Sequence, residues 1–114
     1  MAPDPASLGA VALRDLITSG ALSAEAATAA CLKRIAETEP TLQAWAYVDG
    51  NHAMAQAKAL DARRKAGGAV GMLHGVPVGI KDVIDTARMP TEYGCPITQG
   101  RVPSKDAHLV SRLR

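Results

Sequence analysis

The chain has 114 residues, the size of a single domain. Apolar residues make up 47% of it and exclude a disordered tail, but aromatic residues make up only 3%, which leaves a thin core of Ala, Leu, Val and Ile. The 13 basic and 11 acidic residues are interspersed and sum to +2, so we expect no nucleic-acid partner. So thin a core indicates that these residues are part of a larger domain.

The cysteines and histidines show no metal-ligand or redox spacing, so we expect no metal, no cofactor and a reducing compartment. The residues concerned are Cys31, Cys95, His52, His74 and His108. The sequence has no charged-then-apolar leader and no apolar run approaching about 18 residues. A cytoplasmic protein without membrane contact is expected.

Residues 1–66 are predicted to be mainly helical. Each of three helices follows a residue that can cap it, namely Ser7, Ser23, and Asp49 or Asn51. The helices end at Gly20, at Pro40 and at Gly67-Gly68. The first two form a helix hairpin. Between the second and third, residues 42–48 predict a short strand, with Trp45 as a packing residue.

Residues 67–114 predict a lysine-bearing strand, a loop and the start of a helix. Val76, Val78 and Ile80 alternate with Pro77, Gly79 and Lys81, the period of a strand with two faces. Gly75 and Gly79 leave room for a close backbone. Lys81 ends this strand, where its amine could enter a packed interior. Successive strand side chains point to opposite faces, so Asp82 need not meet Lys81.

A lysine becomes a useful base only when burial loosens its proton, which takes about 4 to 5 kcal/mol of desolvation. Spacing alone leaves two interpretations of Lys81 open: a buried base, or a solvated strand-end lysine paired with a surface carboxylate.

A loop over residues 88–103 follows, punctuated by proline and glycine. Ser104 can cap a last helix whose apolar side is Leu109, Val110 and Leu113. This helical pattern still runs at residue 114, so we expect a unit that continues beyond it. The expected fold class is α/β, with N-terminal helices packed on part of a mixed β-sheet whose other strands lie elsewhere.

The segment Gly71-x-Leu73-x-Gly75-x-Pro77-x-x-x-Lys81-Asp82, followed by Pro90-Thr91-x-x-Gly94, resembles the amidase signature family. These amide hydrolases use a Ser–cis-Ser–Lys triad. The resemblance extends upstream to residues 19–23 and 42–49, and downstream to residues 106–110, so residues 1–114 resemble the N-terminal part of one such domain.

The resemblance implies that Lys81 is the catalytic base, which takes a proton through a bridging serine. It implies that Gly75, Pro77 and Gly79 shape the lysine strand, that Asp82 belongs to the same motif, and that Thr91, Gly94 and Cys95 line the adjacent loop. Both serines would lie downstream of this sequence. Arg88 stands where the family often has glycine, and Cys95 where it often has serine. Cys95 is then a structural replacement or, alternatively, a nucleophile.

The resemblance thus implies hydrolysis of a small-molecule amide, with Lys81 as base and no activity from residues 1–114 alone. One alternative is a non-catalytic remnant or interaction fragment, which would pair with another copy or with a complementing chain. Another alternative is a piece of an amidotransferase A-type subunit.

Overall fold

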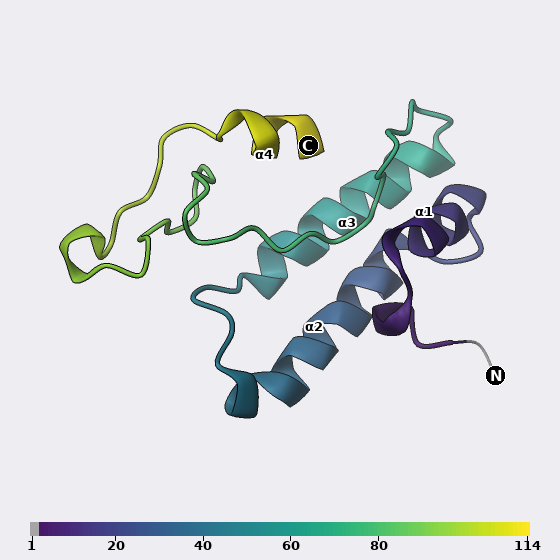
Figure 1. The fold of residues 1–114 in the computed structure, drawn as a ribbon. Helices are drawn as coiled ribbons and strands as arrows, with labels where there is room; N and C mark the ends of the chain where they lie inside the picture. The colour runs from purple at the N-terminus through teal and green to yellow at the C-terminus, as the bar shows by residue number, and fades with distance from the viewer. Residues whose placement is uncertain (1–2) are drawn as a thin grey trace. The chain divides into compact units, whose positions relative to one another are not determined.

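The structure is a computed structural model that describes residues 3–114 as two units, Met1–Pro77 and Val78–Arg114. Every regular element in the described residues is helical (Figure 1). In chain order they are the short 3₁₀ helix η1 (Pro5–Ser7), α1 (Ala10–Ser19), α2 (Ala24–Leu42), α3 (Gly50–Lys65), the 3₁₀ helix η2 (Pro96–Thr98) and α4 (His108–Leu113). The two units are described separately.

The signals predicted for α1 and α2 are confirmed in part. Ser7 lies in η1 and Gly9 precedes α1 without a side-chain cap, so the prediction that Ser7 caps this helix is wrong. Gly20 terminates α1 in a left-handed conformation with φ of 81°. Ser23 caps α2, since its hydroxyl accepts a hydrogen bond from the Ala26 amide, and Glu25 lies in the first turn. Pro40, however, does not stop the helix. It sits in the last turn, where it removes one bond to an earlier carbonyl, and α2 nevertheless continues to Leu42.

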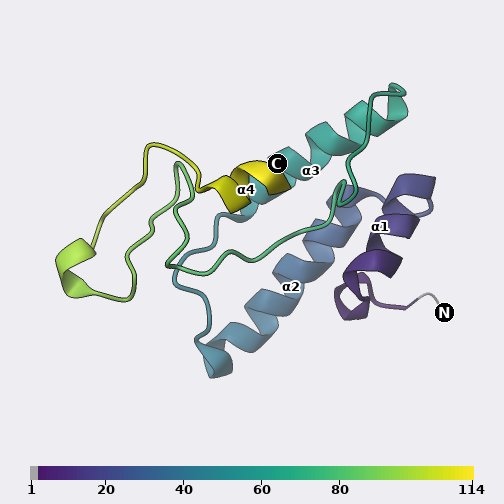
Figure 2. The same cartoon turned by 45° about the horizontal axis from the view of Figure 1, so that its top comes forward.

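The third helix returns alongside α2, and the two lie side by side in both ribbon views (Figures 1 and 2). Asp49 caps α3 by accepting a hydrogen bond from the His52 amide. The core between the helices is small and rich in alanine. It consists of Leu13, Ile17, Ala24, Ala27 and Ala57, with Leu8, Leu22 and Val76 packed against it.

A buried carboxylate from α3 completes this helical unit. Asp61 is 2% exposed and accepts hydrogen bonds from the amides of Ala24 (2.9 Å) and Glu25 (3.0 Å). These amides belong to the first turn of α2, where the N–H groups lack partners within the helix. Asp61 therefore joins α3 to the start of α2.

The prediction of a mixed β-sheet is wrong, because residues 3–114 contain no strand. Residues 43–49 are irregular and exposed, and Trp45 is 42% exposed rather than packed. Residues 76–81 are irregular too. An alternating pattern defines two faces of a strand, but a strand also needs a neighbour to accept its hydrogen bonds. Neither segment has one in the described residues.

The second unit, Val78–Arg114, consists mostly of turns. Its buried apolar side chains among the described residues are Pro103, before α4, and Val110 of α4. The helix α4 begins at His108 without a side-chain cap, so the prediction that Ser104 caps it is wrong. Residues 3–114 include no helix with the length and apolar character needed to cross a bilayer.

Candidate functional site

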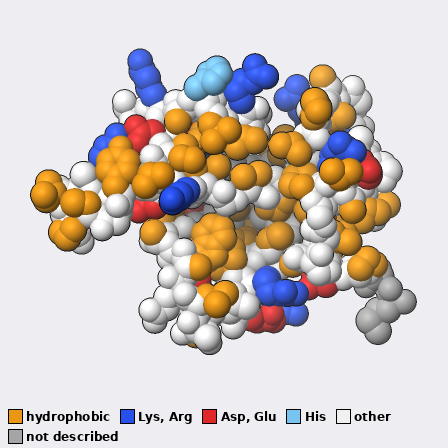
Figure 3. Space-filling view, in the orientation of Figure 1, with side chains coloured by type: hydrophobic (Ala, Val, Ile, Leu, Met, Phe, Trp, Pro, Cys, Tyr) orange, Lys and Arg blue, Asp and Glu red, His pale blue; other side chains and the backbone are white. Residues whose placement is uncertain are grey.

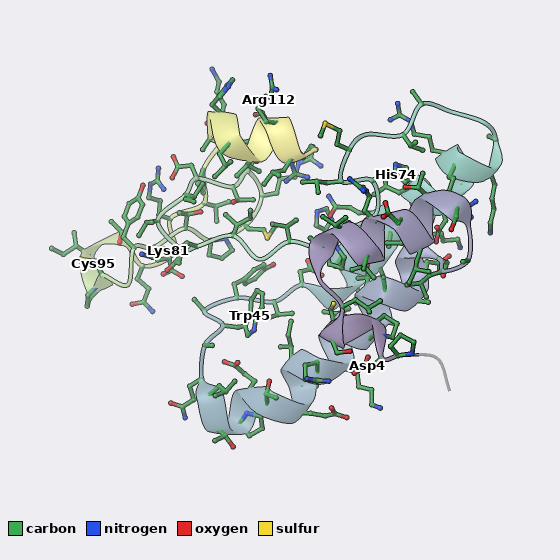
Figure 4. All side chains as sticks on the ribbon, turned by 45° about the vertical axis from the view of Figure 1, so that its right-hand side comes forward. Asp4, Trp45, His74, Lys81, Cys95 and Arg112 are labelled. Carbon is green, nitrogen blue, oxygen red and sulfur yellow. The ribbon has the colours of Figure 1, made fainter. Side chains whose placement is uncertain are left out.

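The glycine-rich segment before Lys81 folds as turns on the first unit. The His74 amide donates to the Gly71 carbonyl at 3.1 Å, and the Val76 amide donates to the Leu73 carbonyl at 3.0 Å. His74 is buried, and its Nε2 lies 3.0 Å from the carbonyl oxygen of Leu60 in α3. The residue is labelled in Figure 4. Its ring thus anchors the segment to a helix.

Gly75 has the close approach that the sequence predicted, but to helices rather than to a strand. Its φ is +76°, in the left-handed region that side chains disfavour. A Cβ placed there would lie 2.9 Å from both the Ala24 Cβ and the Ile17 Cγ2. Only glycine lets the chain cross α1 and α2 so closely. Pro77 ends this unit and is half-buried.

Lys81 opens a turn in the second unit. The Ile84 amide donates to the Lys81 carbonyl at 2.9 Å, so the chain turns where the sequence predicted a strand end. The lysine is exposed, as is Gly79, and Figure 4 shows its place on the irregular part of the chain. Within residues 3–114, Lys81 takes part in none of the ion pairs. The amine is thus not neutralised by a neighbouring carboxylate.

Asp82, the next residue, faces the loop rather than the lysine. Its carboxylate accepts a hydrogen bond from the Glu92 amide at 2.9 Å, and its carbonyl accepts one from the Tyr93 amide at 3.0 Å. These two bonds span about ten residues and bring the lysine turn to the loop at residues 91–95. The structure therefore brings together two of the predicted parts of the site.

The three predicted loop residues have different surroundings. Thr91 is 1% exposed, and its hydroxyl accepts a hydrogen bond from the Thr86 amide at 3.4 Å. Gly94 has φ of +64° and is exposed. Cys95 is half-buried with a free thiol, and its carbonyl accepts bonds from the Thr98 amide and hydroxyl. Thr91 and Cys95 thus help to shape the loop.

A cluster of Asp85, Tyr93 and Arg101 supports the same loop. The guanidinium of Arg101 donates to both carboxylate oxygens of Asp85, at 2.7 and 2.9 Å. It also lies 5.0 Å from the centre of the Tyr93 ring, whose hydroxyl donates to Asp85 at 3.1 Å. The Arg101 hydrogen bonds, with a smaller contribution from Tyr93, lower the pKa of the Asp85 carboxyl. Sequence reasoning missed this cluster, because residues 8 and 16 apart follow no local pattern.

Asp106 plays a similar part farther along the chain. Its carboxylate accepts a hydrogen bond from the Ala87 amide at 2.7 Å, and it pairs with Arg114. The Ala87 hydrogen bond, followed by Arg114, lowers the pKa of Asp106. Asp106 lies before α4 and fastens a turn, outside the helix that Ser104 was expected to cap.

An open depression of about 460 Å³ lies on the second unit. Its lining combines apolar side chains with the two paired carboxylates: Val83, Ile84, Asp85, Tyr93, Lys105, Asp106 and Ala107. Lys81 is not part of the lining. Within residues 3–114, no three His, Cys, Asp or Glu residues lie close enough together to hold a metal ion. The arrangement thus places the exposed amine of Lys81 on a turn that hydrogen bonds hold to the loop, outside this depression.

Similarity to known proteins extends over nearly the whole chain. The A-type subunit of glutamyl-tRNA(Gln) amidotransferase from Acidothermus cellulolyticus is 44% identical over 105 residues, which cover 92% of this chain and 21% of that protein. Its counterpart from Thermobifida fusca is 45% identical over 107 residues, 94% of this chain and 22% of that protein. The chain spans about a fifth of the length of these relatives.

The fold also matches a solved structure. A protein from a study of a vestigial protein complex and the origins of an s-triazine catabolic enzyme superposes with a TM-score of 0.87 at 30% identity, over 93% of this chain and 23% of that one. A family model described as amidase matches residues 26–114, a range that includes Lys81 and every predicted site residue. The chain therefore belongs to the amidase family.

Proposed function

We propose that this chain supplies the base, Lys81, to an active site that hydrolyses carbon–nitrogen amide bonds. The observation that carries the proposal is the amidase-family match over residues 26–114, because it includes the lysine segment and its loop. The amine would take the proton of a hydroxyl nucleophile. In this proposal, sequence outside residues 1–114 supplies that nucleophile and its bridging hydroxyl.

The surroundings of Lys81 support a base in two ways. The lysine has no carboxylate partner among the described residues, so its amine is not engaged in an ion pair. The side chain is also exposed on a turn that hydrogen bonds hold to the loop, so it is open to a further part of the protein. Burial by that part would supply the desolvation that a lysine base requires.

A second candidate function is that of a part of the A-type subunit of an amidotransferase. The similar proteins from Acidothermus cellulolyticus and Thermobifida fusca carry that name, at 44% and 45% identity. On this proposal the same lysine serves an amidotransferase, and the chain works with other subunits. The name of those relatives also makes a complementing chain the partner to test first. The small-molecule amide substrate remains part of the first proposal.

The test is a fusion of residues 1–114 to the remainder of the Thermobifida fusca relative, in place of its matching segment. Ammonia release from a panel of small amides measures turnover. Lys81→Ala should lower kcat by about 10²–10⁴-fold or more, since general-base catalysis contributes that much. Lys81→Arg should fail equally, because a guanidinium stays protonated.

Lys58→Ala is the matched control, because Lys58 is an exposed lysine on α3. It should leave kcat unchanged. Normal turnover by the Lys81→Ala fusion would refute the assignment of the base. A fusion that transfers the amide group only when the other amidotransferase subunits are present would favour the second candidate.

A further inference from the structure

The carboxylate of Asp82 stands next to the proposed base in sequence, yet it is engaged elsewhere. It accepts the Glu92 amide at 2.9 Å, a charge-assisted hydrogen bond that is stronger than a neutral one. It forms no ion pair with a lysine or arginine in the described residues. The backbone of the loop therefore uses this negative charge, and Lys81 does not.

The backbone of Asp82 adds a second bond to the same loop. Its carbonyl accepts the Tyr93 amide at 3.0 Å, so consecutive loop amides bind one residue. The loop is closed on itself as well, because the Glu92 carboxylate accepts the Gly100 amide at 2.8 Å and the Glu92 carbonyl accepts the Thr98 hydroxyl. Movement of the loop would thus move Asp82, and with it the Lys81 turn.

We propose that Asp82 is a positioning residue that fixes Lys81 against the loop at residues 91–95 by accepting the Glu92 amide, and that its charge serves this hydrogen bond rather than acting on the Lys81 amine. This inference rests on the proposed function, since it assigns to Asp82 the placement of that base. The two roles predict different results for Asp82→Asn, because asparagine keeps an oxygen acceptor but carries no charge.

The test compares Asp82→Ala and Asp82→Asn in the fusion protein. Amide hydrogen exchange at Glu92 and Tyr93 measures the hold on the loop, and kcat with its pH profile measures the base. In Asp82→Ala we expect exchange at Glu92 to be faster by about 10- to 100-fold, as for a lost hydrogen bond to a charged group, and kcat to fall by at least about tenfold. Asp82→Asn should keep about half of the hydrogen-bond free energy, so exchange at Glu92 should be faster by only about 3- to 10-fold. Its kcat should stay within about threefold, with the alkaline-rising limb of the profile unmoved.

Glu37→Ala is the matched control, because it removes an exposed carboxylate on α2 whose one ion pair, with Lys33, spans 3.6 Å. It should change neither readout. Unchanged exchange at Glu92 in Asp82→Ala would overturn the proposal. The proposal would also be overturned, in favour of a charge role, if Asp82→Asn and Asp82→Ala lowered kcat equally. A shift of the rising limb of the pH profile in Asp82→Asn would have the same meaning.

The two proposals fail in different ways. If Lys81→Ala keeps turnover, the assignment of the base falls, while exchange at Glu92 still decides whether Asp82 holds the loop. If Asp82→Ala does not fold, Asp82→Asn decides. Faster exchange at Glu92 with unchanged kcat and an unmoved limb supports the acceptor role, a moved limb supports a charge role, and unchanged exchange overturns the proposal.

Discussion

Asp61 shows how one side chain can organise the helical unit. Its two carboxylate oxygens accept the amides of Ala24 and Glu25, so both free N–H groups are satisfied by a residue 37 and 36 positions away. Because only 2% of the Asp61 surface is exposed, water cannot replace these hydrogen bonds. The negative charge also lies at the positive end of the α2 dipole. The residue thus contributes to stability rather than to the proposed chemistry.

We expect Asp61→Ala to lower the free energy of unfolding of the first unit by about 1–3 kcal/mol, because one buried and one part-buried donor lose their acceptor. Asp61→Asn should cost less, since its amide oxygen can still accept one bond. Urea denaturation followed by the fluorescence of Trp45 measures both. Asp15→Ala, which removes an exposed carboxylate on α1, is the control. Equal effects of Asp61→Ala and Asp15→Ala would contradict this role.

At the scale of elements, local signals predicted the helices and failed for the strands. Ser23, Asp49 and Gly20 act within one turn of the chain, so their capping roles could be identified from the sequence. A strand depends on a partner that local sequence does not specify. The alternating segments at residues 42–48 and 76–81 therefore gave a false expectation of a sheet.

The same distinction applies to the candidate site. Gly75 was predictable as a position of close approach, because a glycine beside a proline and aliphatic residues marks it. Its neighbours, Ile17 and Ala24, were not predictable, since they lie far away in sequence. The roles of Asp85 and Arg101 were hidden for the same reason. The catalytic role of Lys81 stays a prediction.

The second unit depends on carboxylates, so its turns should be sensitive to acid. Asp85 and Asp106 have pKa values below the usual 3.8, Asp85 chiefly through Arg101 and Asp106 chiefly through the Ala87 amide. A lowered pKa in the folded state means that the stabilisation is fully present above the usual value and is lost as the pH falls through the folded values. We expect the turns around Ala87 and Tyr93 to loosen only below about pH 4.

An NMR titration of the Ala87 amide and the Tyr93 ring signals measures this transition, because the Tyr93 hydroxyl donates to Asp85 and the Ala87 amide to Asp106. Arg101→Ala should raise the midpoint at Tyr93 toward the usual value for aspartate, because the main cause of the lowered Asp85 pKa is removed. The same change should leave the Ala87 midpoint in place, since Asp106 holds that amide. Coincident shifts at both positions would contradict separate anchoring by the two carboxylates.

For the molecule as a whole, the apolar side chains are distributed unlike those of a self-sufficient domain. The buried apolar side chains of the described residues are alanines, apart from Leu13, Ile17, Pro103 and Val110. By contrast, Met72 is 84% exposed and Ile97 93%. Figure 3 shows hydrophobic side chains over much of the face drawn. Exposed apolar area of this kind marks interaction surfaces or aggregation sites.

We therefore expect residues 1–114, made alone, to self-associate, because apolar contact between copies would bury surface that this chain leaves to water. Sedimentation velocity over a range of protein concentrations measures the effect, as a mean mass that rises with concentration. The double variant Met72→Gln and Ile97→Gln should weaken it, whereas Lys58→Ala should not. The fusion with the remainder of the relative should sediment as a defined species, since the added chain would cover these residues. A concentration-independent monomer of residues 1–114, with one sharp thermal transition, would contradict the prediction and show that the small alanine-rich core is sufficient.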